Sequence, residues 1–126
     1  VQIGRAARIA QNSGIHQFVR IGEFAAVTAV TMIAQDVPPF LMTDHEGRVV
    51  GINRAGLNEA GVSPEIQREI ETLFKIIYGS DMSFHKAIEL AEELTNSEFG
   101  TRFVSFFKTE TRRGFRKRNE EAKDVL

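Results

Sequence analysis

Aliphatic residues recur every six positions through the first quarter of the chain. The recurring residues are Ile3, Ile9, Ile15, Ile21, Val27 and Ile33. A period of six matches neither the 3.6-residue repeat of an α-helix nor the two-residue alternation of an ordinary strand. It is typical of a hexapeptide β-helix, in which each repeat supplies a short strand and a corner and three repeats complete a triangular coil. The pattern therefore predicts a left-handed parallel β-helix of about two coils over residues 1–39.

Two further positions repeat together with the aliphatic one. Four residues after it, where we expect the side chain to lie inside the prism near a corner, the residue is always small or β-branched: Ala7, Ser13, Val19, Ala25, Thr31 and Val37. Directly after it the residue is compact in every repeat except at His16, namely Gly4, Ala10, Gly22, Thr28 and Ala34.

The sequence also indicates how the solenoid ends. We expect the repeats to stop at Asp36-Val37-Pro38-Pro39, because proline has no N–H to donate to a further rung. At Val1 there is no capping sequence, and an open parallel edge would leave N–H and C=O groups unpaired. We therefore expect either that further coils precede Val1 in the parent protein or that another chain covers this end, and we favour the first.

Beyond a glycine-punctuated connection over residues 40–62, the hydrophobic period becomes helical. Ser63 and Pro64 suit the N-cap and the first helical position, and apolar stripes then indicate three helices over residues 63–115. The stripes are Ile66, Ile70, Leu73, Phe74 and Ile77, then Phe84, Ala87, Ile88, Ala91 and Leu94, then Phe99, Phe103, Phe106 and Phe107. We expect these faces, the phenylalanine stripe included, to form the core of a small C-terminal helical domain that closes the end of the prism.

Composition excludes several classes of protein. The chain of 126 residues has a net charge of −1 and a sequence pI of about 6.4, so bulk charge gives no reason to expect nucleic acid or a membrane surface as partner. It contains no cysteine, which fits a reducing cytoplasm. It has neither an apolar stretch long enough to span a bilayer nor the order of residues of a secretory signal. No phosphate-binding loop, metal-ligand spacing or nucleophile elbow is present, and we expect no bound metal or cofactor.

A basic cluster follows the third helix, and two interpretations of it stay open. Its members are Arg112, Arg113, Arg116, Lys117 and Arg118. The first interpretation is a solvated tail that frays into the mixed-charge end, with residues 116–126 flexible. The second is a docking patch for an acidic partner.

The three histidines are the residues most able to carry chemistry. His16 breaks the compact-residue rule of the repeat, so its ring is expected to point out of the prism wall, next to the amide of Gln17. His45 lies in a loop, and His85 lies in the first turn of a helix and is expected to face solvent. A surface histidine without a role is the alternative for His16, and the residues alone indicate only a solenoid with a helical cap.

At the level of whole segments the chain resembles a known family. Residues 3 to about 115 resemble, in order, the C-terminal half of the acyl-carrier-protein-dependent UDP-N-acetylglucosamine O-acyltransferases that start lipid A synthesis. The segments that carry the resemblance are Ile15-His16-Gln17-Phe18, Ile33-Ala34-Gln35-Asp36-Val37-Pro38-Pro39-Phe40 and Gly51-Ile52-Asn53. The hexapeptides by themselves indicate only the wider superfamily of hexapeptide-repeat acyltransferases.

The resemblance implies a cytoplasmic homotrimer with active sites in the clefts between neighbouring prisms. A 3-hydroxyacyl chain would pass from the phosphopantetheine thioester of acyl carrier protein to the 3-hydroxyl of the UDP-sugar, and a histidine upstream of residue 1 would act as general base. By the match, His16 is a supporting active-site histidine, Gln17 contacts substrate and Asn53 contacts the nucleotide. Ala29 and His45 fall where the family sets acyl-chain length, and the basic cluster suits the acidic carrier protein.

The chain also departs from the family pattern. Two arginines that the family uses on the nucleotide side are replaced by Glu59 and Ala60, so either Arg54 substitutes for them or the acceptor differs. Three functions therefore stay open. They are the C-terminal part of this acyltransferase, inactive when isolated; a non-catalytic trimeric module that binds acyl carrier protein or a nucleotide-sugar; and a related hexapeptide acyltransferase with another acceptor.

Overall fold

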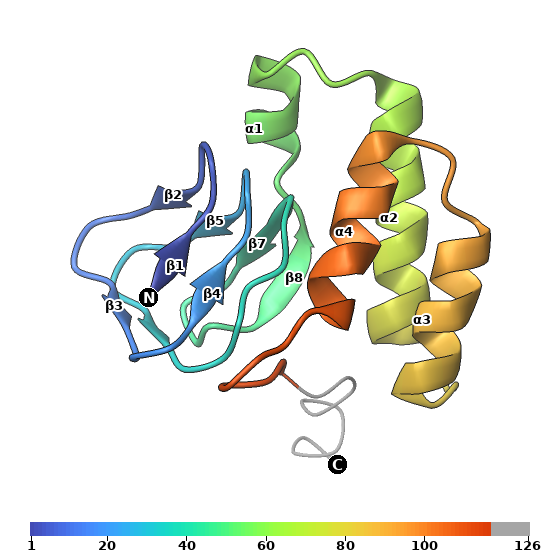
Figure 1. Ribbon diagram of the computed structural model, residues 1–126. Helices are drawn as coiled ribbons and strands as arrows, with labels where there is room; N and C mark the ends of the chain where they lie inside the picture. The colour runs from blue at the N-terminus through green and yellow to red at the C-terminus, as the bar shows by residue number, and fades with distance from the viewer. Residues whose placement is uncertain (117–126) are drawn as a thin grey trace.

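The computed structural model describes residues 1–116. Six two-residue strands wind into a prism, and each ends at one of the six-spaced aliphatic residues. They are β1 Gln2–Ile3, β2 Arg8–Ile9, β3 Gly14–Ile15, β4 Arg20–Ile21, β5 Ala26–Val27 and β6 Met32–Ile33. Pairing is parallel and lies between coils: β1 with β4, β2 with β5 and β3 with β6, which we call the first, second and third faces. The predicted parallel β-helix over these strands is confirmed (Figure 1).

The interior of the prism contains the side chains that the repeat predicts in the second coil, whereas those of the first coil are partly buried and Ile3 is 55% exposed. One hydrophobic cluster, apart from the core of the helices, consists of Val19, Ile21, Ala25, Val27, Ile33 and Val37. The compact position also has a physical reason, because coils stack closely behind it. A β-carbon on Gly4 would lie 2.5 Å from the backbone nitrogen of Glu23, and one on Gly22 would overlap the backbone of Pro39.

The corners of the prism share one unusual backbone conformation. A non-glycine residue with a positive φ of 55–67° stands at each of the five corners that join the six strands: Ala6, Asn12, Phe18, Phe24 and Val30. Phe40 repeats this conformation with a φ of 69°. In this left-handed region a side chain crowds the following carbonyl, so the inter-coil hydrogen bonds and the interior packing must outweigh the strain.

The predicted stop at the two prolines is wrong. Val37 forms a parallel bridge with Ile21, and β7 Leu41–Thr43 pairs in parallel with β5, so a partial third coil stacks on the second. Ladder hydrogen bonds resume directly after Pro39, where the N–H of Phe40 donates to the carbonyl of Glu23. Two residues without an N–H are tolerated because the partners on either side of them restore the pairing.

The third coil is shorter than the first two. Gln2 faces Arg20 across 18 residues, whereas Ile21 faces Val37 across only 16. The two missing residues belong to the corner between the third and the first face, which contains His16–Phe18 in the first coil. Val37 therefore forms a bridge to Ile21 directly after a shortened corner and is not the sixth member of the small-residue set.

The connecting segment 40–62 is more structured than predicted. β7 turns back antiparallel into β8 Val49–Ile52, and α1 Arg54–Glu59 follows with Asn53 as its N-cap. The helical region therefore has four helices among the described residues, one more than the three predicted. α1 lacks an apolar stripe, since only Leu57 of its six residues is buried, and this explains why periodicity did not reveal it.

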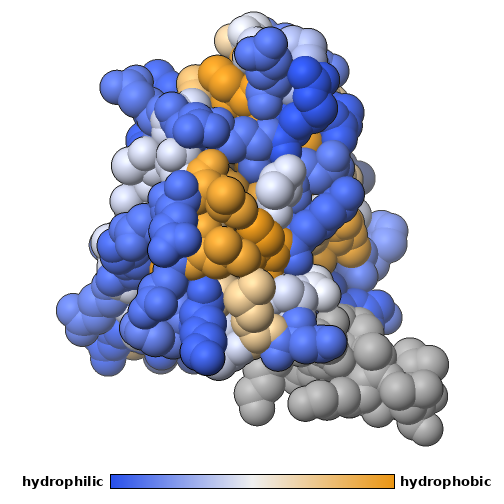
Figure 2. All heavy atoms as spheres, turned by 90° about the vertical axis from the view of Figure 1, so that its right-hand side faces the viewer, coloured by the Kyte–Doolittle hydropathy of each residue, from blue (hydrophilic) through white to orange (hydrophobic). Residues whose placement is uncertain are grey.

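The three longer helices agree with the predicted stripes. They are α2 Pro64–Gly79, α3 Phe84–Glu93 and α4 Glu98–Lys108, capped by Ser63, Ser83 and Ser97. They stand together on one side of the prism, and Figure 2 shows that their outer face is mostly hydrophilic around a central apolar band. Phe40 joins the two parts because its ring contacts Phe24 of the prism and Phe99 of α4. Within residues 1–116 no helix is long and apolar enough to cross a membrane.

Candidate functional site

The predicted site residues lie at three different corners of the prism. His16 and Gln17 occupy the corner between the third and first faces, and Ala29 lies at the corner between the second and third. The amide nitrogen of Asn53 donates to the carbonyl of Phe24 at 2.8 Å, which places Asn53 at the remaining corner. One prism therefore does not bring these residues together, whereas a cleft between two prisms can combine residues from two corners.

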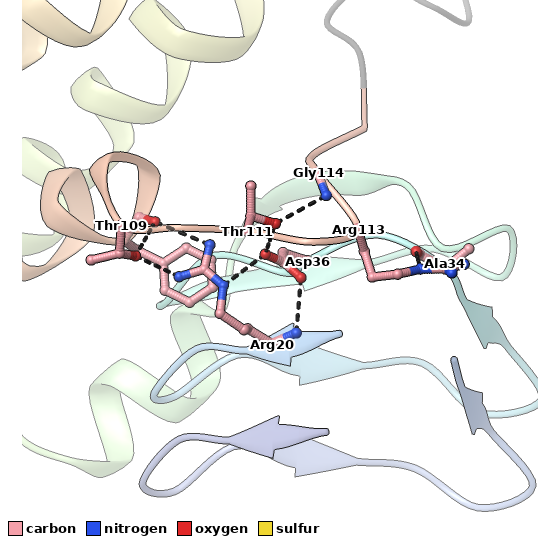
Figure 3. A network of polar contacts seen from close by, with 8 residues as sticks. Arg20, Ala34, Asp36, Thr109, Thr111, Arg113 and Gly114 are labelled. Atoms are coloured by element: carbon pink, nitrogen blue, oxygen red, sulfur yellow. Dashed lines mark hydrogen bonds and ion pairs between the residues drawn. The ribbon is translucent and has the colours of Figure 1, made fainter. Parts of the chain in front are cut away.

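His16 is exposed, as predicted, and has a partner from the far end of the chain. Its Nδ1 lies 2.7 Å from Nη2 of Arg113. The Nε of Arg113 also donates to the carbonyl of Ala34 at 2.9 Å, and Ala34 is the residue one coil above His16 (Figure 3). His16 and a member of the basic cluster thus form one local group on the prism wall.

The other described members of the basic cluster also lie against the prism. The guanidinium carbon of Arg112 lies 3.7 Å from the ring centroid of Phe18, and Nη1 of Arg116 donates to the carbonyl of Glu46 at 3.4 Å. The prediction of a solvated tail is therefore wrong for residues 112–116. Lys117, Arg118 and the rest of the predicted flexible tail lie outside the described residues.

A buried carboxylate attaches this C-terminal segment to the prism. The side chain of Asp36 is fully buried and accepts hydrogen bonds from Nε of Arg20 at 2.7 Å and from Oγ1 of Thr111 at 2.5 Å. The N–H of Asp36 donates to the carbonyl of Gly114, whose own N–H donates to Thr111 Oγ1. The guanidinium of Arg20 lies 4.0 Å from the ring centroid of Phe106 on α4. Figure 3 shows Arg20, Asp36, Thr111 and Gly114 close together where the prism meets the segment after α4.

Tyr78 of α2 is a buried titratable group next to this cluster. Burial raises the pKa of its phenol, and the negative charge of Asp36 raises it further. Its hydroxyl has no hydrogen-bond partner among residues 1–116 and lies in a shell that includes Phe74 and Phe107. The phenol is therefore held in its protonated form.

The turn that contains His45 lies above the corner that contains Ala29. Asp44 to Gly47 form this turn between β7 and β8, and a β-carbon on Gly47 would lie 3.2 Å from the carbonyl of Met32. Thr28, next to Ala29, is hydrogen-bonded to Thr43 at the base of the turn. The structure therefore brings together the two segments predicted to set acyl-chain length.

The side chain of Asn53 has partners within the chain. Its Oδ1 accepts from the N–H of Gly56 at 3.2 Å as the N-cap of α1, while its Nδ2 donates to Phe24. Asn53 is only 8% exposed. It joins α1 to a prism corner, and its contact with a nucleotide stays a prediction.

Comparison with known proteins identifies the family. The family model for domain 2 of UDP-N-acetylglucosamine O-acyltransferase matches residues 36–116, which include Asp36, β7, β8 and the four helices of the described residues. The chain belongs to this family.

The relatives share both sequence and fold. The acyl-[acyl-carrier-protein]–UDP-N-acetylglucosamine O-acyltransferase of Gloeothece citriformis is 34% identical over 112 residues, which are 88% of this chain and 41% of that protein. The UDP-N-acetylglucosamine acyltransferase of Francisella novicida superposes with a TM-score of 0.86 at 29% identity, over 96% of this chain and 45% of that one. The enzyme from Bacteroides fragilis gives 0.84 at 29% identity, over 91% and 46%. The chain thus spans less than half the length of these relatives.

The departure from the acyltransferase pattern has a local explanation in the structure. Glu59 forms an ion pair with Arg8 of β2, with Oε2 and Nη2 2.8 Å apart. Arg54, considered as a substitute for the missing arginines, instead contacts Glu71 of α2 at 3.1 Å. The guanidinium of Arg8, on the prism, therefore places a positive charge beside Glu59, close to where the family pattern has its two arginines.

Sequence reasoning missed the role of two residues at this site. It assigned no role to Asp36 or Thr111, although Asp36 lies within a segment that carried the family resemblance. An aspartate between a buried aliphatic strand and two prolines is a detectable signal, since a buried carboxylate requires partners. The partner Thr111 lies 75 residues away and could not be found from local pattern.

Proposed function

We propose that this chain forms the C-terminal part of an acyltransferase that moves a 3-hydroxyacyl chain from acyl carrier protein to the 3-hydroxyl of UDP-N-acetylglucosamine. The sugar oxygen attacks the thioester carbonyl, and the hydroxyl proton passes to a general base. The carbon–sulfur bond then breaks, and the base returns the proton to the leaving sulfur, so that phosphopantetheine departs as a thiol. The observation that supports the proposal most is the family match over residues 36–116.

The placement of the site residues supports a trimer in which clefts form between prisms. His16, Ala29 and Asn53 lie at three different corners, so each cleft would combine residues from two neighbouring subunits. By the family resemblance, the general base is a histidine upstream of residue 1. His16 and Gln17 would then contribute contacts to bound substrate rather than proton abstraction.

The first experiment asks whether the chain contributes to acyl transfer. We expect no product when the chain alone is mixed with 3-hydroxyacyl carrier protein and UDP-N-acetylglucosamine. Joined to the upstream half of the Gloeothece relative, it should give a trimer that forms product. His16→Ala should then reduce the rate by about 100-fold, as when a hydrogen-bond donor to the reacting substrate is removed. His85→Ala is the matched control, since His85 is exposed and its contact is local, with Nε2 2.8 Å from Oε1 of Glu89.

Two outcomes would contradict this assignment. Product from the chain alone that is lost on His16→Ala would make His16 the general base. A chimaera that binds both substrates without turnover would indicate a non-catalytic trimeric module.

Acceptor specificity needs its own measurement because Glu59 replaces a family arginine. We expect calorimetry with the chimaera to show binding of UDP-N-acetylglucosamine, with Arg8 supplying the positive charge that the family arginines supply elsewhere. Arg8→Met should then weaken binding, and Glu59→Gln should not weaken it. Tighter binding of a different UDP-sugar would favour a related acyltransferase with another acceptor.

Acyl-chain length is the property that we assign to Ala29. Its methyl group is expected to shorten the acyl pocket relative to the glycine that admits longer chains in the family. Ala29→Gly in the chimaera should shift the preference towards longer donors in a series of graded length. A preference of the unsubstituted chain for the longest donor would contradict the assignment.

A further inference from the structure

Arg113 contacts His16 through an atom that can only donate a hydrogen bond. A guanidinium has five N–H donors and no acceptor, and it stays protonated at every pH that proteins experience. At 2.7 Å from Nη2 of Arg113, Nδ1 of His16 must therefore accept the hydrogen bond with its lone pair. A hydrogen bond in this contact therefore requires the tautomer of the imidazole that carries its proton on Nε2.

The second nitrogen of the ring is then available as a donor. Nε2 lies on the opposite side of the imidazole from Nδ1, and His16 is exposed at a prism corner. In histidine sites the hydrogen bond at one nitrogen determines what the other nitrogen can do. With Arg113 in place, His16 presents an N–H donor to whatever binds outside the prism wall.

Arg113 is itself held in place from two directions. Its Nε donates to the carbonyl of Ala34, one coil above His16. On either side of it, Thr111 and Gly114 are hydrogen-bonded to Asp36, the Thr111 contact through the buried carboxylate. Figure 3 shows Arg113 extending along the prism from this attachment towards Ala34.

The shortened corner explains why the arginine fits there. A full-length corner would place two more residues between Ala34 and Asp36, one coil above Phe18, where Arg112 now stacks. Because Val37 pairs with Ile21 after only 16 residues, the corner is short, and the N–H of Asp36 donates to the carbonyl of Gly114 instead. One corner of the prism is thus two residues short, and the segment with Arg113, nearly 80 residues after Ala34, lies in the space beside it.

From these contacts we propose that Arg113 is a positioning residue that fixes His16 as the Nε2–H tautomer, so that His16 donates a hydrogen bond to an acceptor oxygen of the ligand. The attachment of residues 111–114 to Asp36 sets the position of Arg113. The identity of the ligand as an acyl or nucleotide-sugar substrate rests on the proposed function, whereas the tautomer does not.

The tautomer can be measured on the chain itself by nitrogen-15 NMR in alkaline buffer, with the signals of His16 assigned by His16→Gln. We expect Nδ1 of His16 to be unprotonated, Nε2 to be protonated, and a scalar coupling to connect Nδ1 with an Arg113 side-chain nitrogen. Arg113→Met should abolish the coupling and shift the Nδ1 resonance towards that of a free imidazole. Arg113→Lys, which keeps a donor, should retain part of the shift.

Arg112→Met is the matched control, because Arg112 stacks on Phe18 and donates no hydrogen bond to His16 in the structure. It should leave the tautomer of His16 unchanged. A proton on Nδ1 in the unsubstituted chain, or an Nδ1 resonance that is the same with and without Arg113, would overturn the proposal. Thermal unfolding of each variant shows whether it is folded. If Arg113→Met does not fold, Arg113→Lys still tests the proposal.

The chimaera separates this inference from the proposed function. If both hold, Arg113→Met should lower kcat by about ten-fold or more with a smaller change in KM, in the range found when a partner that orients an active-site histidine is removed, and Arg113→Lys should restore part of kcat. If His16 has its proton on Nε2 but the chimaera forms no acylated product, only the proposed function is contradicted. Full acyl transfer by Arg113→Met would overturn the role of Arg113 and leave the proposed function standing.

Discussion

Arg20 and Asp36 form an ion pair across one coil of the prism, with Nε and Oδ2 2.7 Å apart and the carboxylate side chain fully buried. The backbone N–H of Arg20 donates to the second carboxylate oxygen at 2.8 Å. The same guanidinium stacks on Phe106 and donates to Thr109 Oγ1, so the pair also fastens the end of α4. One arginine thus connects the prism, the last helix and the segment that reaches His16.

Removing the arginine of this pair should be costly. Arg20→Met leaves a buried carboxylate without its cation, and the loss of one partner from a buried pair typically costs about 3–5 kcal/mol of unfolding free energy. Arg8→Met is the matched control, because the Arg8–Glu59 pair is exposed and such pairs contribute about 1 kcal/mol or less. Urea unfolding of the two variants measures the difference. Equal losses would contradict the role of Asp36 as an anchor.

The stacking of the coils predicts opposite effects for two glycine substitutions. A β-carbon on Gly22 would overlap the backbone of Pro39, which cannot move away without breaking the third-coil pairing, so Gly22→Ala should cost about 1–3 kcal/mol. Gly51 of β8 has open space at the same position, and Gly51→Ala should be neutral or stabilise by up to about 1 kcal/mol. Thermal or urea unfolding checks both. A stable Gly22→Ala variant would exclude the close approach of the third coil.

Tyr78 should make the protein sensitive to alkali. Its pKa in the folded state is raised above the ordinary value of 10.0 by burial, so its contribution to stability is complete below that pH. The contribution is lost as the pH rises above it, because the phenol ionises more readily in the unfolded chain. Tyr78→Phe should lose less stability above pH 10.0 than the unsubstituted chain.

At neutral pH the same substitution should change stability by no more than about 1 kcal/mol, since the hydroxyl has no partner among the described residues to lose. Near-ultraviolet absorbance of tyrosinate reports the ionisation directly, because the chain has one tyrosine and no tryptophan. Ionisation of Tyr78 at the pH of a free phenol, before unfolding, would contradict its burial.

Asn53 allows structural and binding roles to be separated. Asn53→Ala removes the N-cap of α1 and should cost about 1–2 kcal/mol. Asn53→Asp keeps the capping oxygen but loses the donor to Phe24, so its stability should lie between those of the alanine variant and the unsubstituted chain. Urea unfolding gives the order of the three proteins. Calorimetry with UDP-N-acetylglucosamine then shows whether a folded aspartate variant loses binding, as the predicted nucleotide contact requires.

Much of the fold could be predicted because interior side chains are spaced so regularly. Each six-spaced aliphatic residue ends a strand, and Ser63 caps α2 as its residue type indicates. The third coil was missed because proline was interpreted as a stop, although the ladder resumes at Phe40. α1 was missed because its six residues bury only Leu57, too little for a periodic signal.

The site was predictable in its residues but not in its connections. His16 was identified as the one bulky exception to the compact position, a local property of the repeat. Its partner Arg113 lies 97 residues away, and charge alone gave only a choice between a solvated tail and a docking patch. Which side chains meet across such a separation depends on how the last helix returns to the prism, and no local pattern encodes that path.

The strained corners have a consequence for how such a protein can diversify. At Phe18, Phe24 and Val30 the backbone adopts a left-handed turn at a cost of roughly 1–2 kcal/mol for each side-chain-bearing residue, so the side chains aimed at the axis must supply the compensation. The outward residues next to these turns, such as His16 and Gln17, do not contribute to this interior packing. New recognition chemistry can therefore arise at the edges of the column while the residues that fold it stay the same.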